Sequence, residues 1–531
     1  MSEYHGVVYT KKWVVDLMLD IAGYTIDKCL WHEKVIEPSC GHGSFLKEIV
    51  RRLLFTAKRD KVLDSEHLLY SIRSFDLDEE AVRISRSVVR DELLSYGFSF
   101  KEADYLSEHW VYCGDYLLSD SLTADYVIGN PPYLRSTEIP KENRDKYVSR
   151  ISTMTKGCDL FVGFFQKGLE SLNSNDGVLC YICADRWMQN QYGRYLREFI
   201  SEKYHIDILI KMHDVDAFEV EVSAYPAIIR IDFGNDKIKY VDCSKTFSES
   251  SVSKLKSWLK SDYQDCTISD FSATLINQPR HDSIIPLSNP RSLRTIEHLT
   301  KRFPTLEESG VKLGIGLATG RDNVFIVKNP DVVEVDRILP MFNMRDWRRK
   351  RKTDDIWLVN PWRRDGELVD LSDYPKLQRY FEEHREEIEK RHVAKKNKKA
   401  WYRTIDKINW EIMGSPMLLF PDMSMQADPV YSDGTRYPCH NCYWLVSNTW
   451  DIKALGELLM SDIAESFIDA LAVKMRGGTK RFQAQYLRLI HVPDPRNLSD
   501  DLTKELRSAF ENNDRIAANK AAALAYGLEE L

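Results

Sequence analysis

The stretch that decides the fold is Val35-Ile36-Glu37-Pro38-Ser39-Cys40-Gly41-His42-Gly43-Ser44-Phe45-Leu46. A short apolar run leads into two glycines, and a helical pattern over 44–58 follows them. Glycine accepts positive φ and lets a ligand lie against bare backbone, while N–H groups at a helix start can bind a carboxylate. A Gly-x-Gly turn alone could also be an ordinary tight turn. Strand, glycines and helix together favour the cofactor-binding unit of an open α/β sheet.

Short apolar runs and amphipathic stretches alternate through residues 1–235. This alternation is typical of a doubly wound, mostly parallel sheet of the α/β class. The last two runs could also pair antiparallel, and the sequence leaves that open. The expected strands cover 35–36, 69–75, 111–112, 126–128, 178–183, 206–210 and 227–231, and the expected helices include 44–58, 79–95 and 161–172.

The rest of the chain has a different pattern. Residues 236–304 are rich in Ser, Asp and Lys, so we expect a connecting region there. Residues 305–531 have a mixed α+β pattern with glycine turns, which predicts a second domain. Helical patterns in this domain cover 375–390, 452–475 and 501–524.

The composition allows two or three hydrophobic cores, since 43% of the 531 residues are hydrophobic. No apolar run reaches the roughly 18–20 residues that a membrane span needs. The first residues carry no signal-peptide pattern. The cysteines are scattered, and the Cys439/Cys442 pair has no second pair with which to form a zinc site. We therefore expect a cytoplasmic protein with reduced thiols, no membrane partner and no metal.

Charge is distributed unevenly along the chain. The net charge is −7, which by itself argues against a nucleic-acid partner. Residues 301–531, however, hold 37 Lys and Arg against 36 Asp and Glu, and residues 341–410 hold 19 against 13. Residues 471–490 hold five basic side chains and no acidic ones. Local positive charge suits a phosphate-contacting face, although each basic run could also be an ordinary solvated surface.

Acidic residues follow the second and third predicted strands. An acidic residue at the end of the second strand can accept both ribose hydroxyl protons of a nucleoside cofactor, and we assign Asp76 to this role. Asp78 suits the N-cap of the following helix. Asp115 could accept the amino group of the cofactor's adenine, or it could be a turn residue.

The tetrapeptide Asn130-Pro131-Pro132-Tyr133 follows the fourth predicted strand. The Asn130 side-chain oxygen and the Pro131 carbonyl can accept hydrogen bonds from an amino group, and two prolines stiffen the loop. Such acceptors turn the lone pair of a conjugated amine toward an electrophile, so we predict methyl transfer from S-adenosylmethionine. The alternative is a simple turn at the end of a strand.

Two aromatic residues could stack on a target base. A base inside a duplex must swing out to reach such a pocket, at a cost of roughly a few kcal/mol. Aromatic faces offset this cost by about 1–3 kcal/mol per stacked base. We assign one face to Tyr133 and the opposite face to Phe218, for which a place in the core is the alternative.

Together these residues resemble the gamma-class DNA adenine-N6 methyltransferases of restriction–modification systems, over residues 6–235. Gly6-Val7-Val8-Tyr9-Thr10 is similar to that family's N-terminal cofactor motif, with Lys11 in place of the usual proline. Residues 37–45 are similar to its cofactor loop, and residues 130–133 to its catalytic motif. Because the motif begins with Asn, the resemblance implies adenine N6 rather than cytosine N4 as the target. The implied cofactor-binding residues are Thr10, Glu37, Pro38, Cys40, Gly41, Gly43, Asp76, Asp115, Asn130, Pro132 and Phe164, and the implied base-stacking residues are Tyr133 and Phe218.

The C-terminal half resembles a target recognition domain of the same family. The resemblance rests on residues 316–323 and 325–327 and on three basic runs. It implies double-stranded DNA as the partner, with a cognate restriction endonuclease that acts separately. Phosphate contacts give affinity without sequence information, so the pattern does not identify base-reading residues. The implied DNA-binding residues are Arg345, Arg348, Arg349, Lys350, Arg351, Lys398, Trp401, Arg476, Lys480 and Arg481.

Three other functions fit parts of the pattern. The same Asn-Pro-Pro-Tyr chemistry could methylate an RNA base or a protein glutamine, but such enzymes tend to lack a C-terminal unit of this length. A catalytically silent DNA-binding subunit would not need Gly43, Asn130 and Tyr133. A fused restriction nuclease would need a leading domain and a Pro-Asp…Glu-x-Lys cluster, which we do not find.

Overall fold

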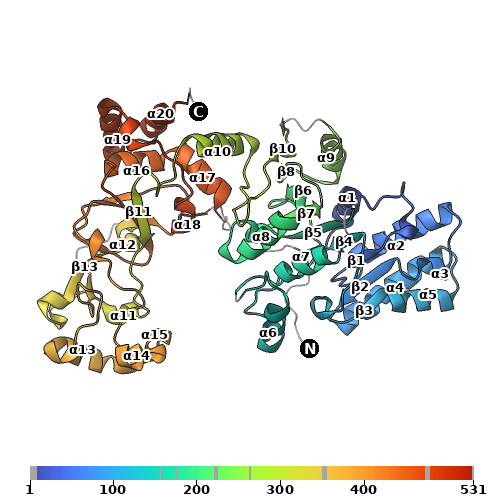
Figure 1. Ribbon diagram of the computed structural model, residues 1–531, viewed down its shortest axis with the longest axis horizontal. Coiled ribbons are helices and arrows are strands. Elements are labelled where there is room, and N and C mark those ends of the chain that lie inside the picture. The colour runs from blue at the N-terminus through green and yellow to red at the C-terminus, as the bar shows by residue number, and fades with distance from the viewer. Residues whose placement is uncertain are drawn as a thin grey trace. The chain divides into compact units, whose positions relative to one another are not determined.

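The computed structural model describes residues 9–155, 157–173, 176–220, 225–261, 265–349, 356–472 and 479–528. Two compact units divide the chain, Met1–Leu293 and Arg294–Leu531, and each is described by itself. Figure 1 shows the first unit in blue to green and the second in yellow-green to red.

A ten-stranded sheet forms the centre of the first unit, in the order β3-β2-β1-β4-β5-β7-β6-β8-β10-β9. Neighbouring strands are parallel from β3 to β5, whereas β7 is antiparallel to both β5 and β6, which settles the pairing that the sequence left open. The strands are β1 (Val35–Glu37), β2 (Ile72–Asp76), β3 (Val111–Cys113), β4 (Tyr126–Gly129), β5 (Val178–Ala184), β6 (His205–Lys211), β7 (Pro226–Asp232), β8 (Ile238–Cys243), β9 (Cys266–Thr267) and β10 (Phe271–Ile276).

Helices cover both faces of this sheet. They are α1 (Lys12–Ala22), α2 (Ser44–Arg59), α3 (Ser65–Leu68), α4 (Glu79–Ser95), α5 (Phe100–Trp110), α6 (Lys141–Arg150), α7 (Phe161–Glu170), α8 (Arg194–Lys203) and α9 (Val252–Leu259). One core joins α1, α2, α4, α5 and α9 to Cys180 and Ile182 of β5. Tyr181, between those two residues, packs edge-on against Phe165 of α7 with ring centroids 5.2 Å apart. Since alternate strand residues point to opposite faces, the predicted doubly wound α/β fold is confirmed.

The sheet extends into residues 236–304, for which a connecting region was predicted. β8 pairs parallel with β6, and β10 pairs antiparallel with β8. The boundary between the units therefore falls after Leu293, and the predicted boundaries at 235 and 304 were wrong. The sequence is misleading here because partly exposed polar residues such as Lys239 and Asp242 interrupt the apolar pattern of β8.

The second unit is mixed α+β. It holds the sheets β11-β19-β15-β17 and β12-β14-β13-β18 and the two-stranded ribbon β16–β20. Its strands are β11 (Val311–Ile315), β12 (Ile326–Val327), β13 (Ile338–Phe342), β14 (Trp357–Val359), β15 (Met417–Pro421), β16 (Met423–Ser424), β17 (Val430–Ser432), β18 (Tyr437–Pro438), β19 (Cys442–Ser447) and β20 (Lys480–Arg481). Its helices are α11 (Asp322–Phe325), α12 (Met344–Arg348), α13 (Pro375–Glu383), α14 (Arg385–Glu389), α15 (His392–Lys396), α16 (Ile452–Met460), α17 (Asp462–Leu471), α18 (Ala484–Leu487), α19 (Asp500–Asn512) and α20 (Arg515–Tyr526), while α10 (Pro290–Arg302) crosses the boundary.

Each of the three long helices predicted in this unit is divided in two. The pairs are α13 and α14, α16 and α17, and α19 and α20. The side chain of Ser461 caps the start of α17, and that of Asp514 caps the start of α20. A cap ends one helix and starts the next without interrupting the apolar periodicity, so the sequence pattern runs on across the break.

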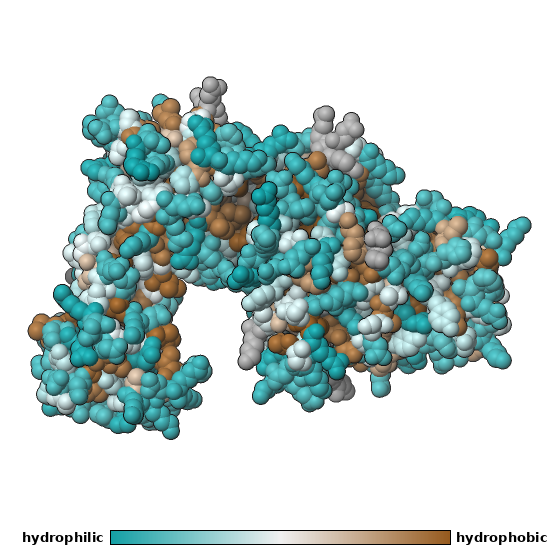
Figure 2. All heavy atoms as spheres, in the orientation of Figure 1, coloured by the Kyte–Doolittle hydropathy of each residue, from teal (hydrophilic) through white to brown (hydrophobic). Residues whose placement is uncertain are grey.

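The surface seen in Figure 2 is predominantly hydrophilic, with hydrophobic residues in smaller groups between the polar ones. Such scattered apolar exposure is ordinary for a folded domain. Among the helices that the structure describes, none is both long and apolar enough to cross a membrane.

Candidate active site

β1 and β4 lie side by side in the sheet and bring the two predicted motifs together. Their register pairs Val35 with Tyr126 and Ile36 with Val127. Gly129 ends β4, and a side-chain carbon placed on it would lie 3.3 Å from Cδ of Pro38. The loop that starts at Asn130 therefore begins beside the glycine turn that follows β1, at the carboxyl edge where open α/β sheets bind ligands.

A pocket opens at this edge of the sheet. It is lined by every residue predicted to bind the cofactor except Gly43. The predicted residues in its wall are Thr10, Glu37, Pro38, Cys40, Gly41, Asp76, Asp115, Asn130, Pro132 and Phe164. The pocket is also lined by residues that were not among the predicted site residues: Tyr9, His42, Tyr116, Leu117, Tyr147 and Leu160.

The two glycines of the turn have φ values of +52° at Gly41 and +85° at Gly43, which side chains rarely tolerate. A side-chain carbon on Gly43 would lie 3.2 Å from the hydroxyl oxygen of Ser85. That hydroxyl donates a hydrogen bond to the Gly41 carbonyl at 2.8 Å. Because Gly43 has no side chain, α4 can pack closely against the turn. Helix α2 starts directly after Gly43, at Ser44.

Asp76 at the end of β2 holds the glycine turn in place. Its Oδ2 accepts a hydrogen bond from the Gly41 amide at 2.8 Å, and its Oδ1 accepts from the Asp78 amide at 3.0 Å. Each carboxylate oxygen has a second lone pair, so the group can accept two further hydrogen bonds from a ligand. Asp78 caps α4 by accepting from the Glu80 amide, which confirms its predicted role.

Asp115 follows β3 and is fixed by two hydrogen bonds. Its Oδ1 accepts from the Leu117 amide at 2.9 Å, and its Oδ2 accepts from the Tyr147 hydroxyl at 2.7 Å. Phe164 lies on the same pocket wall, and its ring centroid is 5.8 Å from that of Tyr116. An acceptor beside flat apolar rings suits a purine with an amino group. Tyr147 is the one buried residue of the charged helix α6, and no motif in the sequence marks it as a site residue.

Glu37 ends β1 and is buried, with 1% of its surface exposed. Burial raises the pKa of Glu37 to about 8; the hydrogen bond from the Ser74 hydroxyl opposes this rise, and the charge of Asp76 adds to it. At neutral pH the carboxyl group is therefore mostly protonated. An uncharged acid at the floor of the pocket can donate as well as accept a hydrogen bond.

The side chain of Asn130 is held by the N-terminal segment. Its Nδ2 donates to the hydroxyl oxygen of Thr10 at 3.3 Å. Thr10 itself pairs with Phe218 as an antiparallel bridge, and the Lys11 amide donates to the Ala217 carbonyl at 3.0 Å. This segment thus connects the catalytic loop to the stretch that leads from β6 to β7. The first residues of the predicted motif, Gly6 to Val8, lie outside the described residues.

Tyr133 and Phe218 are neighbours, as predicted, but they do not face each other. Their ring centroids are 6.4 Å apart and their planes are at 82°. The Tyr133 hydroxyl donates to the Ile182 carbonyl at 3.3 Å, and Phe218 is buried in the core of the unit. A base sandwiched between two rings needs parallel faces, and the two rings do not form such a pair in this conformation, so the stacking role of Phe218 stays a prediction.

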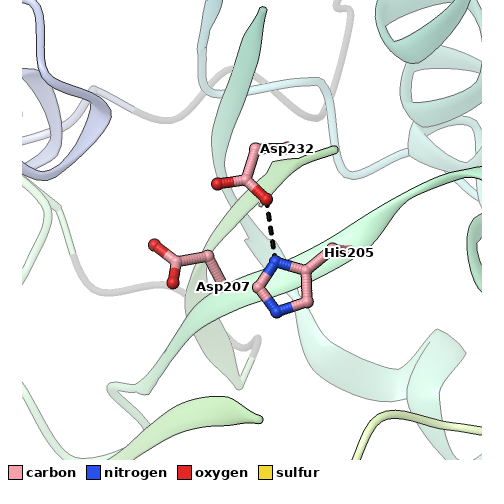
Figure 3. A group of neighbouring side chains, drawn as sticks. All are labelled: His205, Asp207 and Asp232. Carbon is pink, nitrogen blue, oxygen red and sulfur yellow. Dashed lines mark hydrogen bonds and ion pairs between the residues drawn. The ribbon is translucent and has the colours of Figure 1, made fainter. Parts of the chain in front are cut away.

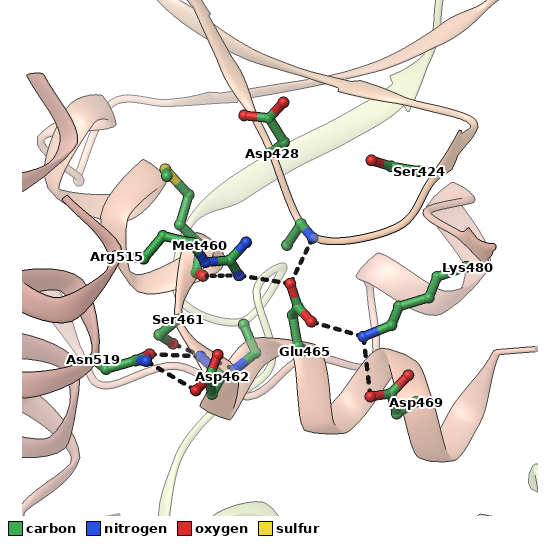
Figure 4. Close-up of polar contacts among 12 residues, drawn as sticks. Ser424, Asp428, Met460, Ser461, Asp462, Glu465, Asp469, Lys480, Arg515 and Asn519 are labelled. Atoms are coloured by element: carbon green, nitrogen blue, oxygen red, sulfur yellow. Dashed lines mark hydrogen bonds and ion pairs between the residues drawn. The ribbon is translucent and has the colours of Figure 1, made fainter. Parts of the chain in front are cut away.

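Lys480 does not present a free charge to a DNA phosphate, contrary to the prediction. Its ammonium group contacts Glu465 at 2.7 Å and Asp469 at 3.1 Å, and only 17% of the side chain is exposed. Figure 4 shows this arrangement, with Arg515 bound to the other oxygen of Glu465. Lys480 therefore joins β20 to α17, and its role is structural.

The remaining predicted DNA-binding residues differ in their surroundings. Trp401 is 7% exposed and stands edge-on to Phe381 in the core of the second unit, so its assignment to DNA is also wrong. Arg481 contacts Asp422 at 3.2 Å. Arg345, Arg348, Arg349 and Lys398 are exposed, whereas Lys350, Arg351 and Arg476 lie outside the described residues.

His205, Asp207 and Asp232 stand close enough together to hold a metal ion (Figure 3). Cations of the chain, however, already neutralise both carboxylates, since Arg230 contacts Asp207 and Asp232, and Lys239 contacts Asp207 at 2.8 Å. Burial opposes protonation of the imidazole, but the hydrogen bond to Asp232 raises the pKa of His205. We interpret this group as an ion-pair network that joins β6, β7 and β8.

Comparison with known proteins identifies the family. The family model described as Eco57I restriction-modification methylase matches residues 48–218, which include the Asn130 motif. The chain is 36% identical to the type II methyltransferase M.XhoI of Xanthomonas vasicola, over 100% of this chain and 98% of that protein. It is 38% identical to the type II methyltransferase M.BstVI of Geobacillus stearothermophilus, over 94% of this chain and 92% of that protein.

A solved structure supports the fold independently. The type IIL restriction-modification enzyme MmeI, solved in complex with DNA, matches with a TM-score of 0.59 over 98% of this chain and 74% of that chain. At 12% identity this similarity bears on the fold alone. The relatives M.XhoI and M.BstVI go further and confirm the resemblance to the methyltransferases of restriction–modification systems. This chain therefore belongs to the type II DNA methyltransferases of restriction–modification systems, in the Eco57I methylase family, and S-adenosylmethionine is its methyl donor.

Proposed function

We propose that this chain transfers a methyl group to N6 of an adenine that has swung out of duplex DNA. The observation that carries the proposal is the position of Asn130, at the end of β4, in the wall of the same pocket as the glycine turn. An amide and a proline carbonyl at this place, Asn130 and Pro131, match the two amino protons of an exocyclic amine. Asn at the first position of the motif favours adenine over cytosine.

The pocket fits S-adenosylmethionine in the chemistry of its donors and acceptors. Asp76 keeps acceptor capacity for two ribose hydroxyls after it has bound the Gly41 and Asp78 amides. Asp115 keeps acceptor capacity for an adenine amino group, beside the ring of Phe164. The bound cofactor supplies an electrophilic methyl group on a sulfonium.

The chain's own contribution is to orient the target amine. The side-chain oxygen of Asn130 and the carbonyl oxygen of Pro131 would accept hydrogen bonds from its two N–H groups, which turns the nitrogen lone pair out of conjugation and toward the methyl group. The hydrogen bond from Asn130 to Thr10 fixes the amide, and the prolines fix the backbone. Tyr133 would supply the aromatic face for the base, with the ring of Phe218 beside it. The surplus proton leaves to water after the transfer, so no general base is needed.

We also infer that a separate endonuclease shares the recognition sequence. M.XhoI and M.BstVI are named as methyltransferases, and the chain covers 98% and 92% of their lengths. By contrast, RM.Eco57I of Escherichia coli is named as both restriction enzyme and methyltransferase, and the chain matches 27% of it. The names of the two more similar relatives thus favour a modification enzyme that works beside its nuclease.

The experiment that tests this function is product analysis after incubation with isotopically labelled S-adenosylmethionine and duplex DNA. We expect label in N6-methyladenine after digestion to nucleosides, at one sequence context only. Parallel incubations with structured RNA and with a glutamine-containing protein should stay unlabelled. Label in N4-methylcytosine, or in RNA or protein instead of DNA, would refute the assignment of the target base.

A further inference from the structure

The exposed apolar side chains of the C-terminal unit are not all scattered. Ile315, Trp347, Met423 and Met425 are 50%, 42%, 48% and 61% exposed. They belong to segments that the fold holds together, as the following contacts show. We call these four residues, with the exposed Arg345 and Arg349, the sheet-end rim. Contiguous apolar exposure beside charge is a mark of an interaction site, unlike single exposed residues.

Strand register places two parts of the rim at one end of a sheet. Ile315 ends β11 opposite Tyr443 of β19, and Pro421 ends β15 opposite Cys442, the neighbouring residue of β19. Met423 follows Pro421 after one residue and starts the β16–β20 ribbon. Ile315 and Met423 therefore emerge from the same end of the β11–β19–β15 sheet.

Hydrogen bonds attach α12 to the same end. The side-chain amide of Asn441, which precedes β19, donates to Oδ1 of Asn343 at 2.9 Å, and Asn343 caps α12. Arg348 at the end of α12 donates to the Met423 carbonyl at 3.2 Å and to the Ser424 hydroxyl at 2.7 Å. Because Arg348 is bonded to the ribbon, the preceding residue, Trp347, is held beside the ribbon as well.

Strand pairing and ion pairs also hold the β16–β20 ribbon in place. Ser424 pairs with Lys480, whose ammonium group is fixed by Glu465 and Asp469 (Figure 4). Ser424 and Lys480, the polar residues next to the rim, are thus already paired within the chain. Within the described residues, by contrast, no hydrogen bond or ion pair holds the side chains of Arg345 and Arg349, which leaves their guanidinium groups for a partner.

We propose that the sheet-end rim reads the base edges of the target sequence in duplex DNA. This proposal rests on the proposed function, in which the C-terminal unit contacts DNA. Arginine can bind the O6 and N7 acceptors of guanine in a bidentate manner, and apolar side chains contact the thymine methyl group. The rim offers both kinds of group on supports fixed by hydrogen bonds. A purely phosphate-binding surface would have no use for exposed Trp347 and Met425.

The test measures which sequences the enzyme methylates. Purified full-length variants Arg349→Ala, Arg349→Lys, Trp347→Ala and Met425→Ala would each be incubated with a library of random duplexes, followed by sequencing that reports modified bases. Arg379→Ala is the matched control, because Arg379 is an exposed arginine on α13 outside the rim. Thermal unfolding and cofactor binding, measured alongside, show that each variant is folded.

We expect Arg349→Ala and Trp347→Ala to relax the methylated motif at one or more positions and to lower kcat/KM on the parent motif roughly ten- to a hundred-fold. Arg349→Lys should relax the motif as well, because lysine keeps the charge but loses the bidentate geometry. An unchanged motif in all rim variants overturns the proposal, and so does a uniform loss across sequences, which indicates phosphate contacts. A parent enzyme that fails to methylate any duplex would instead refute the proposed function itself.

Discussion

The amide of Asn130 donates a hydrogen bond to the hydroxyl of Thr10 across 3.3 Å, and so joins the loop after β4 to the N-terminal segment. Thr10 is 3% exposed, so the bond is shielded from water. In the proposed function, the amide oxygen of Asn130 is the atom that accepts a hydrogen bond from the target base. The orientation of Asn130 therefore depends on a residue far away in the sequence.

Substitutions of Thr10 test whether its hydroxyl group orients Asn130. Thr10→Val keeps the shape of the side chain but removes the acceptor, and we expect kcat to fall about ten-fold, the equivalent of one buried hydrogen bond. Thr10→Ser should restore kcat, because it returns the hydroxyl. Equal kcat in the valine and serine variants would show that the bond does not orient Asn130.

Asp76 supports both the glycine turn and the predicted ribose contact. Asp76→Ala should weaken binding of S-adenosylmethionine about a hundred-fold, since hydrogen bonds to a charged group contribute about 1.5–3 kcal/mol each. Asp64→Ala is the control, because the Asp64 side chain also accepts hydrogen bonds from two backbone amides, at the start of α3 and outside the pocket. Titration calorimetry measures both affinities, and an unchanged Kd for the Asp76 variant would place the ribose acceptor elsewhere.

The buried carboxyl group of Glu37 should make the stability of the folded protein depend on pH. Its pKa of about 8 in the folded chain exceeds the ordinary value of 4.5, so the folded state holds a proton that the unfolded state has lost. Stability should therefore fall as pH rises between these values. The Tm of the cofactor-free parent protein should fall between about pH 5 and about pH 8. Glu37→Gln cannot ionise at this position, so its Tm should fall by less over the same pH range.

The exposed Glu108→Gln, on α5, is the matched control for this measurement. It should leave the pH profile of Tm unchanged. If the Glu37 variant has the same profile as the parent protein, the buried carboxyl is already ionised in the folded state, and the assignment of a protonated acid at the pocket floor is wrong.

Lys480 and Lys398 should behave in opposite ways. Lys480→Met should reduce the free energy of unfolding by about 2 kcal/mol, because it leaves Asp469 without its cation and Glu465 with Arg515 alone. It should not change the salt dependence of DNA binding. Lys398→Met should leave stability unchanged and flatten the salt dependence, since Lys398 is exposed. The reverse pair of results would mean that Lys480 contacts phosphate and Lys398 does not.

The sequence predicted the elements of the first unit in which a regular apolar pattern ends at a functional or capping residue. Apolar runs that end in Glu37, Asp76 and Asn130 marked the strands correctly, because parallel strands place such residues at one edge of a sheet. The α4 prediction of 79–95 matched the structure residue for residue, since Asp78 supplies a cap where the periodic pattern begins.

The errors have physical causes as well. β8 and β10 were missed because their polar residues mask the apolar alternation. Lys480 was assigned to DNA because a basic run does not reveal its carboxylate partners, Glu465 and Asp469, which lie on another helix. Trp401 was assigned to DNA because a tryptophan among lysines looks exposed, whereas its ring packs against Phe381.

In the proposed function, Asn130 orients the amine that receives the methyl group. This role is tested by the single-turnover rate of methyl transfer to duplex DNA by Asn130→Ala, with cofactor affinity measured on the same preparation. We expect the rate to fall at least about a hundred-fold, as for the loss of one group that stabilises a transition state, while the protein still binds S-adenosylmethionine. A rate close to that of the parent enzyme would contradict the account.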